Sequence, residues 1–253
     1  MISEREFARG FGAFWKELFP LLTPQFVRIF NQAYPEPLIN PDGSKLKPVP
    51  IAIENENPSI VAEMAFYIAK RGYENGSTAS EAVKNSDLVK SAEFDALMLA
   101  ELYEGENIED AFNLSQIEQE EAKTLAQIYD TLIAKFPEGS KVIFNPKLNG
   151  AGFLNSCQAD LAIGSTIFEI KTANRNFAGK DLRQLFIYLA LNAAMGEQVW
   201  RNAGFFNPRR ALVAEFQIDT TIYRLSGGKT HADTFDELIS FVSSRAAELD
   251  MAF

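Results

Sequence analysis

Two short apolar segments, residues 154–164 and 166–172, limit the possible folds of this chain more than any other stretch. Both are rich in aliphatic and β-branched residues, which is typical of strands that are buried in a sheet. The Gly164-Ser165 pair between them is typical of a tight turn. The pattern therefore predicts a β-hairpin, and with it a sheet that the remaining helices must cover.

Three polar residues interrupt this apolar hairpin. Side chains alternate along a strand, so Glu169 and Lys171 are expected to project from one face of the second strand. Asp160 lies on the first strand at a comparable distance from the turn. We therefore expect two carboxylates and an ammonium to meet at one end of the sheet.

Such a group has a chemical use. Carboxylate oxygens suit a hard cation such as Mg²⁺, which keeps several waters and is held by few protein ligands. A bound cation can activate water and stabilise charge on a phosphodiester, while a nearby lysine can orient the water or stabilise the same charge. The alternative interpretation is an ordinary salt bridge on the surface of a hairpin.

A helix is predicted over residues 180–196, directly after the hairpin and a short loop. Gln184 and Tyr188 are one helical turn apart and share a face. An amide and a phenol in this arrangement could orient Lys171, a metal-bound water or a phosphate. The alternative is that they form the polar edge of a packed helix.

Asp160, the Glu169-Ile170-Lys171 triplet and the Gln184–Tyr188 pair together resemble the PD-(D/E)XK nuclease superfamily, and in particular its RecB-type branch with a QxxxY helix. The resemblance covers residues 115–225, and Ala159 replaces the name-giving proline, a position without chemistry. It implies a restriction-endonuclease-like αβββαβ core and a nuclease active in repair, recombination, mobile elements or phage defence. It also implies Mg²⁺ or Mn²⁺ at Asp160 and Glu169, with Lys171, Gln184 and Tyr188 completing the catalytic group.

The order of elements after residue 114 was predicted without reference to that resemblance. Ser115 and Glu118 form a capping box that opens a long helix. Strands are expected over 141–148 and in the hairpin, followed by the helix of Gln184, two strands over 209–218 and 221–226, and a final helix over 235–250. The chain is therefore α/β, with a core over residues 115–253.

Glu121 is the candidate for a third acidic ligand. It lies on the same face of the predicted helix as Ile117, Leu125 and Ile128, and an acid on a buried stripe is costly unless it is paired or bound to metal. The resemblance implies one further acid from the helix before the sheet. The alternative is a carboxylate at the edge of the stripe that reaches water.

Residues 1–114 are predicted to be a helical region. A capping box at Ser3 and Glu6 opens a helix over 6–19, and further helices are expected over 24–34, 59–73, 78–84 and 87–103. The Pro- and Gly-rich stretch 35–50 is expected to be an irregular connection. The function of this region does not follow from its residues.

The composition restricts the remaining possibilities. No apolar run approaches the roughly 18 residues of a membrane helix, the first residues lack the apolar core of a signal peptide, and one cysteine forms no intrachain disulfide, so a cytoplasmic protein is expected. The net charge of −10 argues against a general nucleic-acid coat protein. Between Lys141 and Arg210, however, nine basic residues stand against four acidic ones, which fits a surface that faces phosphate.

The sequence thus predicts a metal-dependent nuclease that hydrolyses phosphodiester bonds, with DNA favoured over RNA as the substrate. The competing hypothesis is a catalytically silent subunit that keeps the fold and binds nucleic acid or a partner. The overall acidity favours a protein partner for the helical N-terminal region. The presence together of Asp160, Glu169 and Lys171 favours the enzyme.

Overall fold

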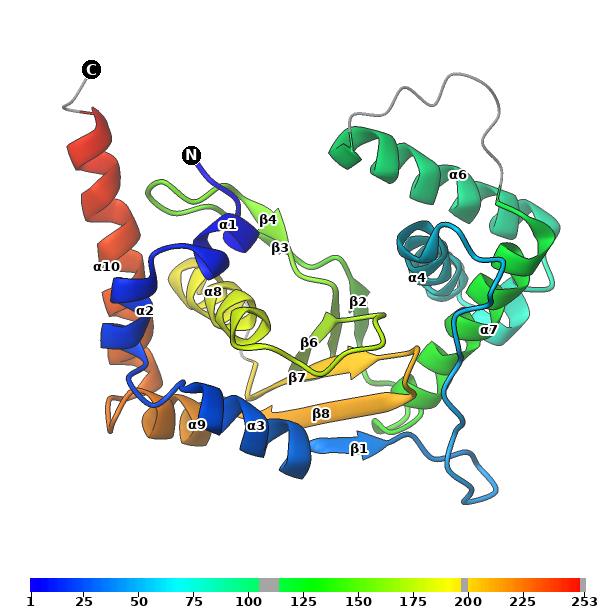
Figure 1. Cartoon of the computed structure of the whole chain (residues 1–253), viewed down its shortest axis with the longest axis horizontal. Helices are drawn as coiled ribbons and strands as arrows, with labels where there is room; N and C mark the ends of the chain where they lie inside the picture. The colour runs from blue at the N-terminus through cyan, green and yellow to red at the C-terminus, as the bar shows by residue number, and fades with distance from the viewer. Residues whose placement is uncertain (105–113, 197–199, 251–253) are drawn as a thin grey trace.

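A six-stranded mixed sheet lies at the centre of the protein, as seen in a computed structural model that describes residues 1–104, 114–196 and 200–250. The strand order is β1-β8-β7-β6-β5-β2, in which only β6 and β7 are parallel neighbours (Figure 1). The strands are β1 (Pro35–Pro37), β2 (Val142–Phe144), β5 (Leu161–Ile163), β6 (Thr166–Ile170), β7 (Asn202–Asn207) and β8 (Leu212–Gln217).

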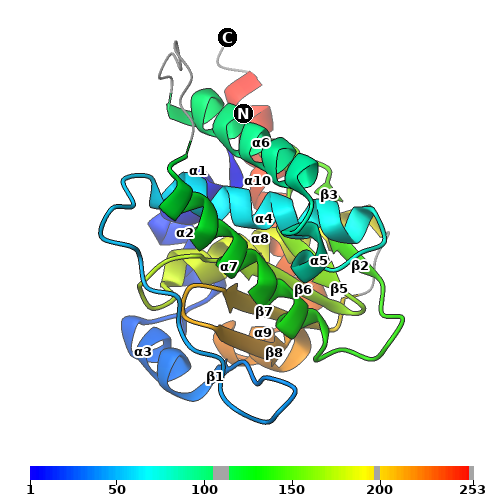
Figure 2. The ribbon, with the colours of Figure 1, turned by 90° about the vertical axis from the view of Figure 1, so that its right-hand side faces the viewer.

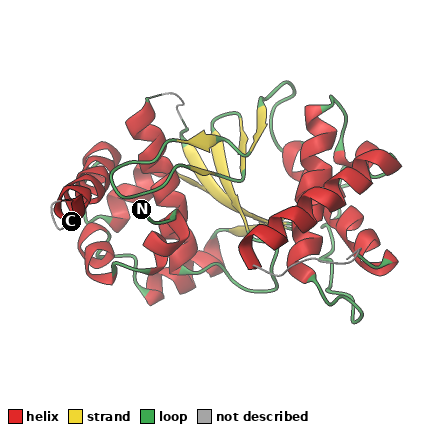
Figure 3. Ribbon diagram, turned by 90° about the horizontal axis from the view of Figure 1, so that it is seen from above, coloured by secondary structure: helices red, strands yellow, loops and turns green. Residues whose placement is uncertain are grey.

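Helices cover both faces of this sheet (Figure 3). One layer consists of α1 (Glu4–Arg9), α2 (Gly12–Leu18), α3 (Pro24–Ala33), α8 (Gly179–Met195), α9 (Ile218–Leu225) and α10 (His231–Asp250). The other consists of α4 (Pro58–Glu74), α5 (Ala79–Ala82), α6 (Ser86–Glu104) and α7 (Gln116–Ile133), which lie in front of the sheet in Figure 2. The predicted α/β class is confirmed in this general form.

Each strand divides its side chains between the two layers, as the two-residue period of a strand requires. On β6, Ile167 packs into the core beneath α8, while Phe168 packs into the core beneath α4 and α7. On β7, Phe205 and Phe206 divide in the same way. Glu169 follows Phe168 and therefore faces the α8 layer.

The predicted hairpin is present as β5 and β6. Gly164 at its turn has φ +56°, a conformation that glycine adopts at little cost, and Leu161 lies opposite Phe168. The first strand is shorter than predicted, because the chain leaves the sheet at Asp160 and continues in the small β3–β4 pair (Lys147–Leu148 and Cys157–Gln158). Asp160 thus lies just outside β5, so the alternation of side chains along that strand does not fix the direction of its carboxylate.

The parallel β6–β7 pair requires a crossover, and α8 supplies it. Gly204 on β7 permits close packing at this point, because a Cβ there would lie 2.5 Å from the Ala214 carbonyl oxygen and 2.8 Å from the ring of Phe168. The crossover begins immediately after Lys171 and returns through the helix of Gln184. One β-α-β unit therefore brings together Glu169 and Lys171 with Gln184 and Tyr188.

Two features of the N-terminal region differ from the prediction. The helix expected over 6–19 is two helices, α1 and α2, because Phe11 between Gly10 and Gly12 adopts φ 53° and breaks the helical backbone. Within the expected irregular stretch 35–50, β1 pairs with β8 at the edge of the sheet. Helices α1 to α3 contribute side chains to the core on the α8 side of the sheet, and α4 to α6 contribute side chains to the core on the other side.

The C-terminal region also differs. β7 was not predicted, and the strand expected over 221–226 is wrong, because these residues belong to α9. The buried side chains Ile218, Thr221, Ile222 and Leu225 recur every three or four residues, which is the period of a helix. α10 begins at His231, earlier than expected, where Thr230 accepts a hydrogen bond from the Asp233 amide. No helix within the described residues is long and apolar enough to cross a membrane.

Candidate functional site

Glu169 and Lys171 are joined by an ion pair at the end of β6. Lys171 also donates a hydrogen bond of 3.2 Å to the side-chain oxygen of Gln184 on α8. Glu169 is only 1% exposed, and its second oxygen, Oε2, has no hydrogen-bond partner among the described residues. An unpaired oxygen on a buried carboxylate costs free energy, so a positively charged ligand at this position would stabilise the folded protein.

Asp160 faces the same end of the sheet. Its Oδ2 accepts a 2.6 Å hydrogen bond from the backbone amide of Ile170, which holds the side chain beside the Glu169–Lys171 pair. Burial raises the pKa of Asp160, although the charge of Lys171 and the Ile170 hydrogen bond oppose the shift. Burial also raises the pKa of Glu169, and the neighbouring negative charge of Asp160 raises it further. The negative charge of Asp160 thus opposes ionisation of Glu169.

A third acid, Glu63 on α4, acts on this group through its charge and was missed by sequence reasoning. Burial raises the pKa of Glu63, while the charges of Arg5 and Lys171 lower it, and the negative charge of Glu63 raises the pKa of Asp160 in turn. A sequence signal exists, since Glu63 is the only charged residue between Pro58 and Ala69. That signal does not show which strand the helix meets, so only the tertiary structure assigns Glu63 to the group.

Glu121, the acid predicted for this role, is placed elsewhere. Its carboxylate pairs with Arg209 at 2.7 Å and accepts hydrogen bonds from the amide of Ala52 at 2.8 Å and from Asn55 at 2.9 Å. Glu121 and Arg209 are both almost fully buried. The cost of burying this acid on the α7 stripe is thus met by an ion pair, and the structure does not bring Glu121 to Asp160 and Glu169.

Gln184 and Tyr188 share a face of α8, as predicted. The Gln184 amide donates to the Tyr188 hydroxyl at 2.8 Å and to Glu4 of α1 at 3.3 Å, while its oxygen accepts from Lys171. Burial, together with the charges of Glu169 and Asp160, raises the pKa of Tyr188 well above its usual range, so the hydroxyl keeps its proton. The pair therefore fixes the position of the lysine ammonium.

The N-terminal segment forms one wall of the site. Ile2 is bound in register beside Phe153 and Asn155 by two backbone hydrogen bonds of 2.9 and 3.0 Å, which places α1 against α8. Glu4 contacts Gln184, and Arg5 lies near the acids: burial lowers the pKa of Arg5, but the negative charges of the site, Glu169 and Asp160 among them, raise it overall. Nothing in the sequence of α1 indicated this position.

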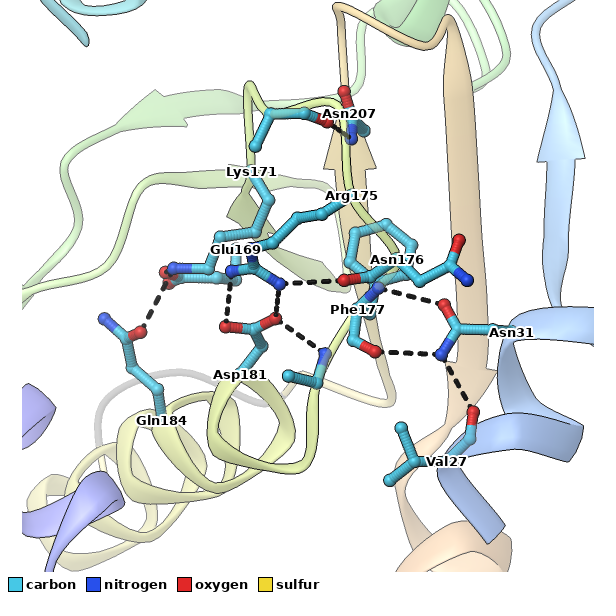
Figure 4. Close-up of polar contacts among 12 residues, drawn as sticks. Val27, Asn31, Glu169, Lys171, Arg175, Asn176, Phe177, Asp181, Gln184 and Asn207 are labelled. Atoms are coloured by element: carbon cyan, nitrogen blue, oxygen red, sulfur yellow. Dashed lines mark hydrogen bonds and ion pairs between the residues drawn. The ribbon is translucent and has the colours of Figure 1, made fainter. Parts of the chain in front are cut away.

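Hydrogen bonds and an ion pair hold the loop between Lys171 and α8 in place at three points (Figure 4). Asn31 of α3 exchanges hydrogen bonds of 2.8 and 2.9 Å with the backbone of Phe177, and Asn207 donates to the Ala173 carbonyl at 2.8 Å. Asp181 binds both ends of the Arg175 guanidinium at 2.7 and 3.0 Å. These contacts fix the backbone that leads from the lysine to the glutamine.

The donor set suits a hard divalent cation. Within the described ranges, no group of three or more His, Cys, Asp or Glu side chains is arranged to enclose a metal. Two carboxylates are sufficient for Mg²⁺, which keeps several of its waters and takes further oxygens from a phosphate. The unpaired Glu169 oxygen and the raised pKa values of three neighbouring acids fit such a ligand, because a cation would relieve both.

Comparisons of the chain with protein-family models, with curated proteins and with solved structures find no match. The residues and geometry of the site are therefore the basis for proposing a function.

Proposed function

We propose that this protein is a metal-dependent nuclease that hydrolyses phosphodiester bonds, with DNA favoured over RNA. The observation that carries the proposal is the buried Glu169 oxygen without a partner, on a carboxylate that lies beside Asp160 and is paired with Lys171. Asp181, a buried carboxylate in a structural ion pair, instead uses both of its oxygens with Arg175. The unpaired oxygen of Glu169 is thus available as a ligand for a cation.

The arrangement of elements supports a finer description of the fold. If the short β3–β4 pair is treated as an insertion between β2 and β5, the order α7, β2, β5, β6, α8, β7 is compatible with the αβββαβ succession of a restriction-endonuclease-like core. The spacing of Asp160, Glu169, Lys171, Gln184 and Tyr188 resembles the RecB-type branch of the PD-(D/E)XK nucleases. On this proposal α4 supplies the additional acid, Glu63, in the place that the sequence suggested for Glu121.

Each residue of the group then has a role in hydrolysis. Asp160 and Glu169 would hold Mg²⁺ or Mn²⁺, with Glu63 adding negative charge nearby, and the bound cation supplies Lewis-acid stabilisation of the phosphate and activation of water. Lys171 would orient the attacking water and stabilise the negative charge that develops on the phosphate. Gln184 holds the Lys171 ammonium, and Tyr188 holds Gln184.

The test is cleavage of single- and double-stranded DNA and RNA in Mg²⁺, Mn²⁺ or EDTA. Wild type is compared with Lys171→Ala and Asp160→Asn, and with Lys84→Ala and Asp236→Asn as matched substitutions of exposed residues. We expect metal-dependent cleavage that is lost in the first pair and retained in the second. A wild type that cleaves no substrate, yet binds nucleic acid as well as its site variants do, would favour the catalytically silent subunit instead.

A further inference from the structure

A small cavity next to Lys171 is lined mostly by basic side chains. It has a volume of about 170 Å³, several times the roughly 30 Å³ that one liquid water occupies. It lies between α1 and the first turn of α8, and part of its wall is seen around Arg175 and Lys171 in Figure 4. Its basic residues are Arg5, Arg9, Lys171, Arg175 and Lys180.

Among the described residues, one carboxylate lines the cavity, that of Asp181, and it already has hydrogen-bond partners. Asp181 is 2% exposed, binds both ends of Arg175 and accepts a 2.8 Å hydrogen bond from the Ala178 amide. Burial alone would raise the pKa of Asp181, but the hydrogen bonds from Arg175 and Ala178 and the charge of Lys171 lower it overall. Asp181 therefore offsets the charge of Arg175 and aims its guanidinium, without neutralising the other cations.

The other basic residues of the cavity have few carboxylate partners. In the described part of the chain, neither Arg9 nor Lys180 has a carboxylate within 4.0 Å, and Arg5 reaches only Glu4, at 3.6 Å. Like charges crowded around one cavity repel one another, and an anion in the cavity would relieve that repulsion. This concentration of positive charge is notable in a chain whose net charge is −10.

The cavity is continuous with the candidate active site, because Lys171 belongs to both. Its ammonium is bound to Glu169 and Gln184, and both Lys171 and Gln184 also line the cavity. A group held there is therefore adjacent to the position of the phosphate that would be cleaved. Arginine is well suited to this task, since its planar guanidinium binds two phosphate oxygens at once.

We propose that this cavity is a phosphate-binding subsite that holds a second phosphate of the nucleic acid beside the scissile one. The proposal rests on the proposed nuclease function and deepens it. It also assigns a role to α1, whose Arg5 and Arg9 supply two of the cations. The phosphate is either an internal phosphodiester or a terminal phosphomonoester, which carries more negative charge.

The test is binding of short fluorescein-labelled oligonucleotides, measured by anisotropy in EDTA so that no cleavage occurs. Each sequence is made as a single strand and as a duplex, with a 5′-phosphate, a 3′-phosphate or hydroxyl ends. Wild type is compared with the double variant Arg9→Gln and Lys180→Gln, whose substituted side chains are exposed and threaten no core contact. Arg224→Gln on the distant helix α9 is the matched control.

We expect the double variant to bind about tenfold more weakly, and the slope of log affinity against log salt to fall by about two, one for each lost phosphate contact. A loss limited to one phosphorylated end identifies a terminal phosphate, whereas an equal loss for all oligonucleotides identifies an internal one. Affinity and salt slope equal to those of wild type would overturn the subsite, as would a wild type that binds no oligonucleotide.

Parallel cleavage assays separate this proposal from the nuclease itself. Cleavage that persists, together with unchanged binding in the double variant, would remove the subsite and keep the nuclease. Absence of cleavage by wild type in Mg²⁺ and Mn²⁺, together with phosphate binding that depends on Arg9 and Lys180, would remove the nuclease and keep the anion site.

Discussion

Buried or half-buried carboxylates occur both among the helices α4 to α7 and at the ends of strands β5 and β6, but their partners differ. On α7, Glu121 is bound by Arg209, Ala52 and Asn55, and Glu118 is bound by Ser115 and Asn57. At the strand ends, Glu169 has one oxygen without a partner. The carboxylates on α7 therefore have partners within the fold, whereas Glu169 has an oxygen that the fold leaves without one.

The difference indicates which buried acids have a functional rather than a structural role. A buried acid with all its hydrogen bonds satisfied has a sufficient structural reason to be there. A buried acid whose pKa is raised by burial and by neighbouring acids reduces the stability of the folded state, and such groups are concentrated at sites that bind ligands. We therefore expect equivalent Glu→Gln substitutions in the two regions to have opposite effects.

The largest expected effect is on catalysis. Glu169→Gln should reduce the cleavage rate by about 10³-fold or more, because it removes a charged ligand from the metal and a partner from Lys171. Glu121→Gln should leave the rate per folded molecule within a few-fold of wild type. Single-turnover cleavage at saturating Mg²⁺ measures both, and an equal loss in the two variants would contradict the distinction between the regions.

The next effect is on stability, in the opposite order. Glu121→Gln leaves Arg209 buried without its counter-ion, and removing one partner of a buried pair costs roughly 3–5 kcal/mol. Glu169→Gln also removes a partner from Lys171, but that side chain is 18% exposed and keeps its hydrogen bond to Gln184. Because the substitution removes a charge that is buried beside Asp160, the metal-free protein should be at least as stable as wild type. Urea unfolding in EDTA provides the free energies, and a larger loss for Glu169→Gln would reverse our interpretation.

Glu63 and Glu118 are expected to differ in the same way, although both lie in one helical layer. Burial raises the pKa of Glu63, so Glu63→Gln should raise the melting temperature in EDTA by about 2–4 °C, as expected for roughly 1 kcal/mol in a chain of this size. The same variant should weaken Mn²⁺ binding by about tenfold. Glu118→Gln, which weakens a capping box, should lower the melting temperature instead.

The smallest effect is a dependence of stability on pH. The raised pKa values of Asp160 and Glu169 mean that the folded protein keeps protons that the unfolded chain releases near pH 4. Their contribution to stability is therefore present below that pH and is lost as the pH rises through the raised folded values. The stabilisation by Mg²⁺ should increase over the same interval, because the metal binds the ionised acids.

Thermal unfolding from pH 4.5 to 8.5, with and without Mg²⁺, measures this dependence. The double variant Asp160→Asn and Glu169→Gln should show a flatter profile in EDTA and little response to Mg²⁺. A response to Mg²⁺ as large as that of wild type would place the cation elsewhere on the protein.

Local periodicity was sufficient to predict most of the site. The two-residue period of β6 correctly placed Glu169 and Lys171 on one face, and the helical period of α8 placed Gln184 beside Tyr188. These residues are near one another in the chain, so a single β-α unit fixes their arrangement. No such rule relates α1 or α4 to that unit, and the positions of Arg5 and Glu63 therefore came only from the tertiary structure.

The errors in the fold have physical reasons as well. The β-branched and aromatic residues Thr221, Ile222 and Tyr223 favour a strand locally, but burial of one helical face against the sheet layer decides for α9. β7 was missed because it contains Gly204, which weakens a strand signal yet is required for close contact with Phe168 and Ala214. Glu121 was misplaced because its partner, Arg209, is 88 positions away in the chain.

On this proposal, the unpaired oxygen of Glu169 is a ligand of a bound cation. Anomalous diffraction from crystals grown with Mn²⁺ tests it most directly, because the metal is located without reference to activity. We expect a Mn²⁺ peak within about 2.5 Å of carboxylate oxygens of both Asp160 and Glu169. A map at saturating Mn²⁺ with no peak at these two residues would contradict the account.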